Sequence, residues 1–202
     1  MKEYHKIQSV FKRDGKTLID GAWTLPEFEY LADNLWTLTE KVDGTNIRIM
    51  FKDGKITFGG RTDNADIPAA LITRLNERFL PQAETMQNMF NDDVCLYGEG
   101  YGAKIQNGGN YRQDPDFVLF DVRIGDFWLQ RDSIVDIAEK LSLDVVPIIG
   151  ETTLKQAVEM VRGGIKSTWG DFQAEGVIAK PLVELKTRNG ERIITKIKCK
   201  DF

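Results

Sequence analysis

The sequence predicts an α+β fold with mainly antiparallel sheets. Two observations carry this prediction: apolar runs with the two-residue period of strands follow one another through tight turns, and segments with helical spacing are interspersed among them. A chain of 202 residues, 42% hydrophobic and 29% charged, is long and apolar enough to bury a core. It has no repeat and no Pro/Ser-rich linker, so we expect a single domain over residues 1–202.

Strand-like segments run from the first quarter of the chain to its end. Alternation of apolar and polar residues predicts strands at 35–41 and 45–51. Asp53-Gly54 predicts a hairpin turn that leads from the second of these into a strand at 56–58. The other predicted strands are buried runs at 94–98 and 117–122 and C-terminal segments at 175–180 and 192–199.

Three segments have the spacing of helices. Residues 67–79 are expected to form a helix with Pro68 in its first turn, because proline lacks an N–H that this turn leaves unpaired. A second helix is expected at 134–141, behind an Asp-Ser cap at 132–133. A third is expected at 154–161, after two threonines and before a pair of glycines.

The scarcity of histidine and cysteine excludes several classes of enzyme. A Ser-His-Asp or Cys-His triad would have to use His5, the one histidine in the chain. A zinc site needs about four nitrogen or sulfur ligands, and His5, Cys95 and Cys199 are too few. An enzyme with this composition therefore works with carboxylates, lysines and arginines, or with a bound cofactor or metal.

Charge and hydropathy limit the partners. The net charge of -4 argues against a broad phosphate-binding surface, although it leaves room for a local basic cleft. No apolar run approaches the ~18 residues of a membrane span, and the N-terminus lacks the apolar core of a signal peptide. We therefore expect a cytoplasmic protein without a membrane partner.

Two glycine-containing segments look like phosphate-binding motifs but lack the required spacing. The segment GGIKST at 163–168 has no adjacent Gly-Lys and no correctly placed first glycine, so it is not a P-loop. The G-x-G-x-G at 98–102 is not a dinucleotide fingerprint, which also needs a helix directly after it.

Five short segments concentrate charged residues and glycines within apolar strands. Taken singly, each is explained by a solvated strand face or a tight turn. Taken together, their order along the chain is distinctive. The segments are EKVDGTN (40–46), FGGRTD (58–63), LYGEGYG (96–102), AEGVIAK (174–180) and KIKCKDF (196–202).

The ordered pattern K-x-D-G, R, Y-G-E, F-D, E-G-x-x-x-K and K-x-K resembles the covalent nucleotidyltransferases, which are nucleic-acid ligases and mRNA capping enzymes. The segment EKVDGTN, with Asn46, resembles the RNA-ligase branch, and within it the nick-sealing RNA ligases of bacteriophage and of RNA editing. The resemblance extends from about residue 35 to the end. It implies a nucleotidyltransferase (ATP-grasp-like ligase) core, in which two mainly antiparallel sheets with flanking helices form a nucleotide cleft.

By this resemblance, Lys41 is the nucleophile that takes AMP from ATP. A free lysine has a pKa of ~10.4, so fewer than about one in a thousand is the neutral amine at pH 7, and activation needs nearby cations or a metal. Lys196 and Lys198 match the lysines that hold the α-phosphate. Strand alternation also places Lys200 on their face, so a Lys198/Lys200 pair stays an alternative.

The resemblance also assigns the nucleotide contacts. Glu99 would bind the ribose, and Phe120 would stack on the adenine, with Phe117 as the alternative. The other matches are Glu175 as ligand of Mg²⁺ (or Mn²⁺), Arg61 and Asn46 beside the phosphates, and Glu40 at the position whose backbone reads the adenine edge. Ordinary ion pairs, core packing and turns are the competing explanations for each of these residues.

The implied activity is that of an ATP-dependent RNA ligase. AMP bound covalently to Lys41 would pass to a 5′-phosphate RNA end, and a 3′-hydroxyl would then seal the strand, as in RNA repair. The implied substrates are RNA ends in a nicked duplex or in otherwise paired RNA, and the residues leave the choice between duplex and single strand open. The chain ends at the K-x-K strand, where many related enzymes continue into a C-terminal domain. We therefore expect either self-adenylylation with poor sealing or dependence on an accessory protein.

Two other functions remain in competition. The first is a DNA ligase or a GTP-dependent capping-type enzyme of the same superfamily, against which Asn46 and the absent C-terminal module weigh. The second is a non-catalytic module that binds a nucleotide or an RNA end. The complete set of lysines weighs against the second alternative, because a binder has no need of Lys41.

Overall fold

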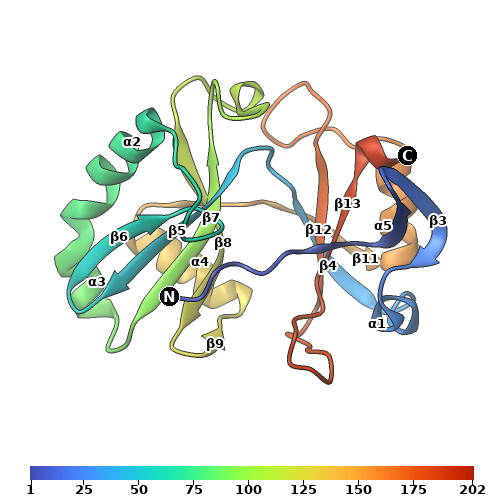
Figure 1. Cartoon of the computed structure of the whole chain (residues 1–202), viewed down its shortest axis with the longest axis horizontal. Coiled ribbons are helices and arrows are strands. Elements are labelled where there is room, and N and C mark those ends of the chain that lie inside the picture. Colours follow the sequence, from blue (N-terminus) through green and yellow to red (C-terminus); the bar gives the residue numbers. More distant parts are fainter. The chain divides into compact units, whose positions relative to one another are not determined.

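The computed structural model describes all residues 1–202, which form two compact units (Figure 1). Unit 1 comprises Met1–His5 and Asp43–Val146, and unit 2 comprises Lys6–Val42 and Pro147–Phe202. Each unit is therefore assembled from two separate stretches of chain. That residues 1–202 act as one domain remains a prediction. None of the helices is both long and apolar enough to cross a membrane.

Unit 1 is built on a six-stranded sheet with the order β10-β8-β7-β5-β6. The sixth strand, β9, pairs with the C-terminal end of β8. All neighbouring strands are antiparallel except β10 and β8. The strands are β5 (Thr45–Lys52), β6 (Lys55–Gly59), β7 (Val94–Tyr101), β8 (Asp116–Ile124), β9 (Phe127–Trp128) and β10 (Asp144–Val145).

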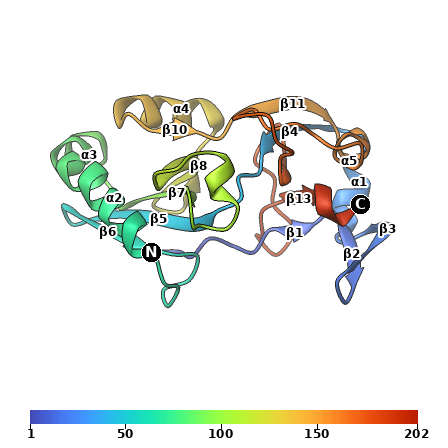
Figure 2. The ribbon, with the colours of Figure 1, turned by 90° about the horizontal axis from the view of Figure 1, so that it is seen from above.

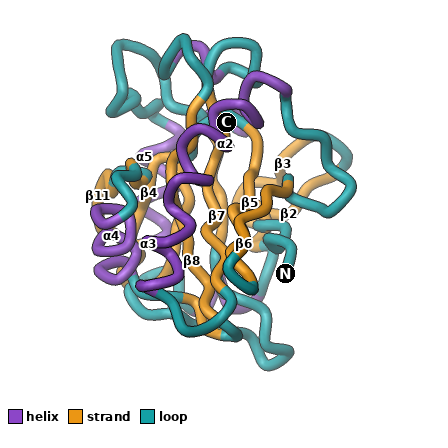
Figure 3. Tube along the Cα trace, turned by 90° about the vertical axis from the view of Figure 1, so that its left-hand side faces the viewer, coloured by secondary structure: helices purple, strands orange, loops and turns teal.

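Helices cover one face of this sheet. Ile47, Ile49 and Leu96 pack on that face against Leu71 and Leu75 of the first helix. In Figures 2 and 3 the helices lie on one side of the strands and the N-terminus lies on the other. The helices are α2 (Ala69–Phe79), α3 (Ala83–Met89) and α4 (Arg131–Lys140), with 3-10 turns η1 (Leu80–Gln82) and η2 (Gly108–Asn110).

Unit 2 is built on a five-stranded sheet with the order β1-β13-β12-β4-β11 and carries a separate hairpin, β2-β3. Only β1 and β13 run parallel. The elements are β1 (Gln8–Ser9), β2 (Phe11–Asp14), β3 (Thr17–Trp23), α1 (Pro26–Tyr30), β4 (Leu35–Glu40), β11 (Ile148–Thr153), α5 (Leu154–Arg162), β12 (Gly176–Pro181), β13 (Thr195–Lys198) and the 3-10 turn η3 (Cys199–Asp201).

The core of unit 2 lies between this sheet and α5. Trp36 and Leu38 of β4 and Val177 of β12 pack with Leu154 and Val158 of the helix. Successive side chains of a strand point to opposite faces, so the intervening residues of β4, β12 and β13 lie on the face away from this core. That open face carries Thr39, Ile178, Lys196 and Lys198, which occupy neighbouring register positions.

The structure confirms the α+β prediction and most of the predicted strands. In the predicted hairpin, Asp53 and Gly54 have φ of 50° and 73°, as a two-residue turn between right-twisted strands requires. A capping box at Thr153 begins α5 at the predicted place. These features depend only on neighbouring residues, which is why the sequence predicts them.

Three local predictions are wrong in detail. Pro68 is the N-cap of α2 rather than a residue of its first turn. The cap expected at 132–133 is displaced, because α4 begins after Gln130 and includes Asp132 in its first turn. The strand expected at 192–199 is confined to Thr195–Lys198, since the chain turns into a 3-10 helix at Cys199.

The first five residues pack on the open face of the unit 1 sheet. The Tyr4 hydroxyl donates a buried hydrogen bond of 2.6 Å to the Asp121 carboxylate, and the Tyr97 hydroxyl donates one of 2.8 Å to the Lys2 carbonyl. The Tyr4 ring also meets the Phe120 ring edge-on at 5.0 Å. The N-terminal segment thus forms part of the surface around Phe120.

A fully buried arginine holds the loop that follows β6. The Arg48 Nε donates to the Gly60 carbonyl at 2.7 Å, and Nη2 donates to Asp63 Oδ1 at 2.7 Å. A side chain at Gly59 would place its Cβ 2.9 Å from Arg48 Nη2, so glycine leaves room for the guanidinium. Arg48 therefore fixes the backbone on both sides of Arg61.

We predict that Arg48→Met destabilises the protein. The change leaves the buried Gly60 carbonyl without its donor, which costs about 1–3 kcal/mol of the free energy of unfolding. Urea denaturation measures this cost. Lys52→Met is the matched control, because Lys52 is an exposed lysine of the same strand, paired with Asp93, and its loss should change stability little. Equal stability of wild type and Arg48→Met would show that the loop does not depend on this arginine.

Candidate functional site

In each unit, the predicted site residues lie at the sheet face that the helices of that unit do not cover. Glu40 is the exception. Unit 2 contributes Lys41, Glu175, Lys196 and Lys198 to this face, whereas Glu40 lies on the helix side. Unit 1 contributes Asn46, Glu99, Phe120 and, in the loop after β6, Arg61.

The centre of the unit 2 group is a carboxylate between two lysines. Lys41 Nζ donates to Glu175 Oε2 at 2.5 Å, and Lys198 Nζ lies 2.6 Å from Glu175 Oε1. All three side chains are mostly buried, so these ion pairs are poorly screened by water. The structure thus brings together residues that are far apart in the sequence, since Lys41 and Lys198 are separated by 157 positions.

This arrangement sets the protonation of Glu175. Burial by itself disfavours the charged carboxylate, but Lys41 and Lys198 outweigh burial and hold the pKa of Glu175 below its usual value. One carboxylate meets two ammonium groups here, so the group keeps a positive charge. That surplus suits a ligand with anionic oxygens.

Lys196 adds a third cation on the same face. Burial lowers the pKa of Lys196, and the positive charges of Lys198 and Lys41 lower it further. Lys196 and Lys198 are both on β13, opposite Ile178 and Gly176 of β12. Lys200 is exposed in η3 beyond the strand, so the lysines that share the strand face are Lys196 and Lys198.

Backbone packing explains why the sequence E-G stands at the start of β12. The Lys41 N–H donates to the Gly176 carbonyl and the Cys199 N–H donates to the Glu175 carbonyl, each at 3.0 Å. Gly176 has φ of 152°, and a Cβ there would lie 2.0 Å from the Ile197 carbonyl oxygen. Only glycine fits between these strands, and its fit places Glu175 between the two lysines.

Glu40 is a structural anchor on the opposite side of β4. Its buried carboxylate accepts hydrogen bonds from the Ser167 hydroxyl at 2.6 Å, the Thr168 N–H at 2.8 Å and the Thr168 hydroxyl at 2.7 Å. Its N–H donates to the Pro147 carbonyl at 3.1 Å. The Ser-Thr pair of the segment GGIKST therefore binds Glu40, a function that sequence reasoning missed.

In unit 1, Asn46 and Glu99 are direct cross-strand neighbours on β5 and β7. The Asn46 Oδ1 atom is buried and has no hydrogen-bond partner within the chain. A buried polar atom without a partner costs about 1–3 kcal/mol, and such atoms in native proteins usually bind water or a ligand. This observation favours a polar ligand beside Asn46.

The two aromatic candidates differ in their surroundings. Phe117 is fully buried on the helix side, where its ring meets Phe79 at 5.6 Å. Phe120 is half-buried and sits at an irregularity of the β7-β8 pairing, where Tyr97 faces Asp121 and Gly98 faces Leu119. The extra residue of this bulge is Phe120 itself. Of the two rings, only that of the half-buried Phe120 is partly accessible to a ligand.

Asn107 and Tyr111, in the segment after β7, hold Asp43, the aspartate of the K-x-D-G motif. Asn107 Nδ2 donates to Asp43 Oδ2 at 2.5 Å, and the Asp43 N–H donates to the Tyr111 hydroxyl at 3.3 Å. A Cβ at Gly44 would lie 2.3 Å from the Gly100 carbonyl oxygen, so this glycine permits close packing of the motif on β7. Arg61, by contrast, is exposed and forms no ion pair.

Comparison with known proteins identifies the family. A family model described as RNA ligase matches residues 34–198. Among solved structures, the chain is similar to the RNA ligase of Naegleria gruberi in several forms, and it covers just over half of those chains.

An arginine-to-alanine variant with ATP and Mn has a TM-score of 0.72 at 20% identity, with coverage of 98% of this chain and 56% of that one. An apo aspartate-to-alanine variant has a TM-score of 0.69 at 19% identity, covering 98% and 58%. The enzyme with PPi has a TM-score of 0.67 at 24% identity, covering 86% and 52%. These identities show a shared fold, and the family model extends over most of the sequence, so the chain belongs to the RNA ligase family.

Proposed function

We propose that this protein is an ATP-dependent RNA ligase that joins 3′-hydroxyl and 5′-phosphate RNA ends through an AMP adduct on Lys41. The observation that carries the proposal is the contact of Lys41 and Lys198 with Glu175 on the open face of a sheet in an RNA ligase fold. The similar Naegleria gruberi ligase has been solved with ATP and Mn, with AMP and Mn, and with PPi. Those ligands fit the proposed first step.

Lys41 needs its neutral amine to act as a nucleophile. Its Nζ atom donates a hydrogen bond of 2.5 Å to the Glu175 carboxylate, so the amine must leave this contact before it can reach the α-phosphorus. Lys196 and Lys198 share the sheet face with Lys41 and would bind the phosphate oxygens. Release of Lys41 from Glu175 is thus the proposed trigger of the reaction.

The first step transfers an adenylyl group. The Lys41 Nζ lone pair attacks the α-phosphorus of ATP, an N–P bond forms, the bond to the bridging oxygen breaks, and pyrophosphate leaves with that electron pair. The attacking nitrogen releases one proton to water in the process. Lys196 and Lys198 balance the negative charge on the α-phosphate while this happens.

Two further transfers complete the proposed reaction. A 5′-phosphate oxygen of RNA attacks the adenylyl phosphorus, and Lys41 leaves, which gives a 5′-5′ pyrophosphate end. A 3′-hydroxyl oxygen then attacks the RNA phosphorus, AMP leaves, and the strand is sealed. We propose paired ends in a nicked duplex as the substrate, which corresponds to a repair reaction.

The nucleotide contacts that the resemblance assigns to residues of unit 1 are also part of the proposal. Phe120 stacks on the adenine, since the open part of its ring offers an apolar face. Glu99 accepts a hydrogen bond from the ribose, and Asn46 supplies its unpaired amide oxygen or its amide N–H groups. Arg61 is exposed in the loop held by Arg48 and binds a phosphate.

The residues fit Mg²⁺, or Mn²⁺ in its place, bound through one carboxylate. The chain has no group of three or more His, Cys, Asp and Glu side chains arranged for a metal ion. Mg²⁺ does not need such a group, because it keeps several waters and takes phosphate oxygens as ligands. Glu175 would hold it. When bound, such an ion neutralises charge on the phosphates.

Strand sealing tests the whole proposal. With ATP, a nicked RNA duplex should be sealed faster than a nicked DNA duplex. ATP should label the protein, and GTP should not. Equal labelling by GTP would favour the capping-type alternative. Nucleotide binding without any covalent adduct would favour the non-catalytic module. Labelling without sealing at any protein concentration would point to an accessory protein as the missing component.

We predict that Lys41→Ala abolishes the AMP adduct, because it removes the amine that forms the N–P bond in the proposed first step. Lys41→Arg should fail as well, since the guanidinium stays protonated and is a poor nucleophile. Intact-protein mass spectrometry after incubation with ATP and Mg²⁺ measures the adduct. Lys200→Ala is the matched control, an exposed lysine just beyond β13 that should label normally. An adduct on either Lys41 variant would overturn the assignment.

We also predict that Glu175→Gln and Lys198→Ala slow adenylylation by about 100-fold or more, as loss of a preorganised charge at a phosphate does. The rate of pyrophosphate release under single-turnover conditions measures the effect. Glu159→Gln, an exposed carboxylate of α5, serves as the control. Wild-type rates for both variants would mean that the group formed by Lys41, Glu175 and Lys198 is an ordinary ion-pair cluster.

A further inference from the structure

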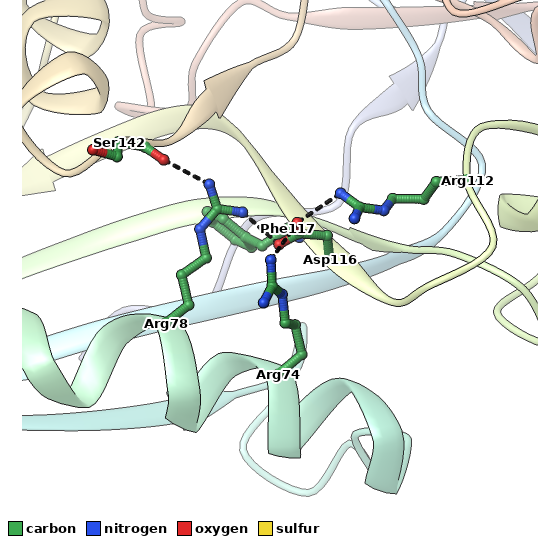
Figure 4. A network of polar contacts seen from close by, with 6 residues as sticks. All are labelled: Arg74, Arg78, Arg112, Asp116, Phe117 and Ser142. Carbon is green, nitrogen blue, oxygen red and sulfur yellow. Dashed lines mark hydrogen bonds and ion pairs between the residues drawn. The ribbon is translucent and has the colours of Figure 1, made fainter.

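A second charged cluster in unit 1 surrounds the first residue of β8. Arg74 and Arg78 lie one turn apart on α2, and Arg112 comes from the segment that leads into β8 (Figure 4). All three guanidinium groups converge on the carboxylate of Asp116, which is buried. None of these residues belongs to the proposed nucleotide contacts.

The Asp116 carboxylate is saturated with donors. Oδ1 accepts from the Phe117 N–H at 2.9 Å and from Arg78 Nη1, and Oδ2 accepts from Arg112 Nη1 at 2.6 Å and from Arg74 Nη2 at 3.3 Å. Arg78 also donates to the Ser142 carbonyl at 2.6 Å. Burial disfavours the carboxylate, but the Phe117 N–H and Arg78 outweigh it and keep the pKa of Asp116 low.

The cluster holds more positive charge than its carboxylate can neutralise. Three arginines face one aspartate, so the four groups together carry a charge of +2. Arg78 alone, with the Phe117 N–H, satisfies Oδ1 and neutralises the charge. A purely structural link between α2 and β8 therefore does not need Arg74 and Arg112, whose mutual repulsion is a cost.

The surplus arginines are accessible and have unused donors. The side chains of Arg74 and Arg112 are 42% and 32% exposed, against 17% for Arg78. A guanidinium has five N–H donors, and Arg74 uses one of them in this cluster. Arg112 donates to Asp116 through Nη1, and its guanidinium carbon lies 5.8 Å from the centroid of the Tyr101 ring. Asp116 thus holds two guanidinium groups in place and takes one N–H group from each.

We propose that Arg74 and Arg112, held in place by Asp116, bind the phosphodiester backbone of RNA. Arginine forks match phosphate oxygens, and fixing them beforehand reduces the entropy lost on binding. A chain with a net charge of -4 must bind a polyanion through a local cluster of this kind. The choice of RNA over another phosphate ligand rests on the proposed function.

The decisive variant is Arg74→Ala in the full chain. Arg74 makes the longest of the contacts with Asp116 and is the most exposed, so its loss leaves Asp116 paired with Arg78 and Arg112. Arg74→Lys keeps the charge without the fork. The matched control is Lys140→Ala, which removes an exposed cation from α4 of the same unit, where Lys140 pairs with Asp136.

Fluorescence anisotropy with a nicked RNA duplex that lacks the reactive 3′-hydroxyl measures affinity over a range of salt concentrations. For Arg74→Ala the slope of log affinity against log salt should fall in magnitude by about 0.9, the value of one phosphate contact on a duplex. Arg74→Lys should keep most of the slope, and Lys140→Ala all of it. Urea denaturation of each variant verifies that the fold is kept.

Three results would overturn this proposal. The first is an unchanged slope for Arg74→Ala, which would leave the arginines with a structural role alone. The second is slower AMP labelling at limiting ATP with an unchanged RNA slope, which would assign the cluster to the triphosphate. The third is no RNA binding by the wild-type chain. A reduced slope together with no AMP adduct on the wild type would instead contradict the proposed ligase function and leave the RNA surface standing.

Discussion

The alternation of side chains along a strand is the constraint on which both units depend. Helices cover one face of each sheet, and the strand residues that point to that face are mainly apolar. The other face is then available for charged and polar side chains. At the end of β4, Glu40 turns to the helix side and binds Thr168, while the next residue, Lys41, pairs with Glu175. One step along the chain thus separates a structural anchor from the candidate nucleophile.

Strand order supplies the second constraint in unit 2. Since β12 lies between β4 and β13, a residue just before β12 meets residues from both neighbours. Glu175 is that residue, and Gly176 lets the three backbones approach closely enough for the contacts with Lys41 and Lys198. The group is a stable set of ion pairs, and Lys41 must leave its contact with Glu175 before its amine can reach a phosphorus atom. The proposed reaction therefore competes with the ion pair for Lys41.

The features that the sequence predicts depend on neighbouring residues, whereas the features that it misses depend on residues far apart in the chain. The turn at Asp53-Gly54 and the capping box at Thr153 are encoded by adjacent residues and were predictable. The contact between Glu40 and Thr168 joins positions 128 apart, and Asn107 binds Asp43 across 64 positions. No periodicity or motif spacing encodes such pairs. The ordered motifs do bring the candidate residues to strands or to the positions beside them, since Glu99 lies within β7 and Glu175 directly before β12.

The two charged clusters share a design but use different cations. Glu175 pairs with two lysines and Asp116 with three arginines, so each carboxylate holds more positive charge than it neutralises. A lysine amine can lose its proton when its surroundings change, and a guanidinium keeps its charge at any physiological pH. Lysines therefore suit the place where a nitrogen must form a bond. Arginines suit a place where a polyanion must be held without chemistry, and this difference follows from the side chains alone.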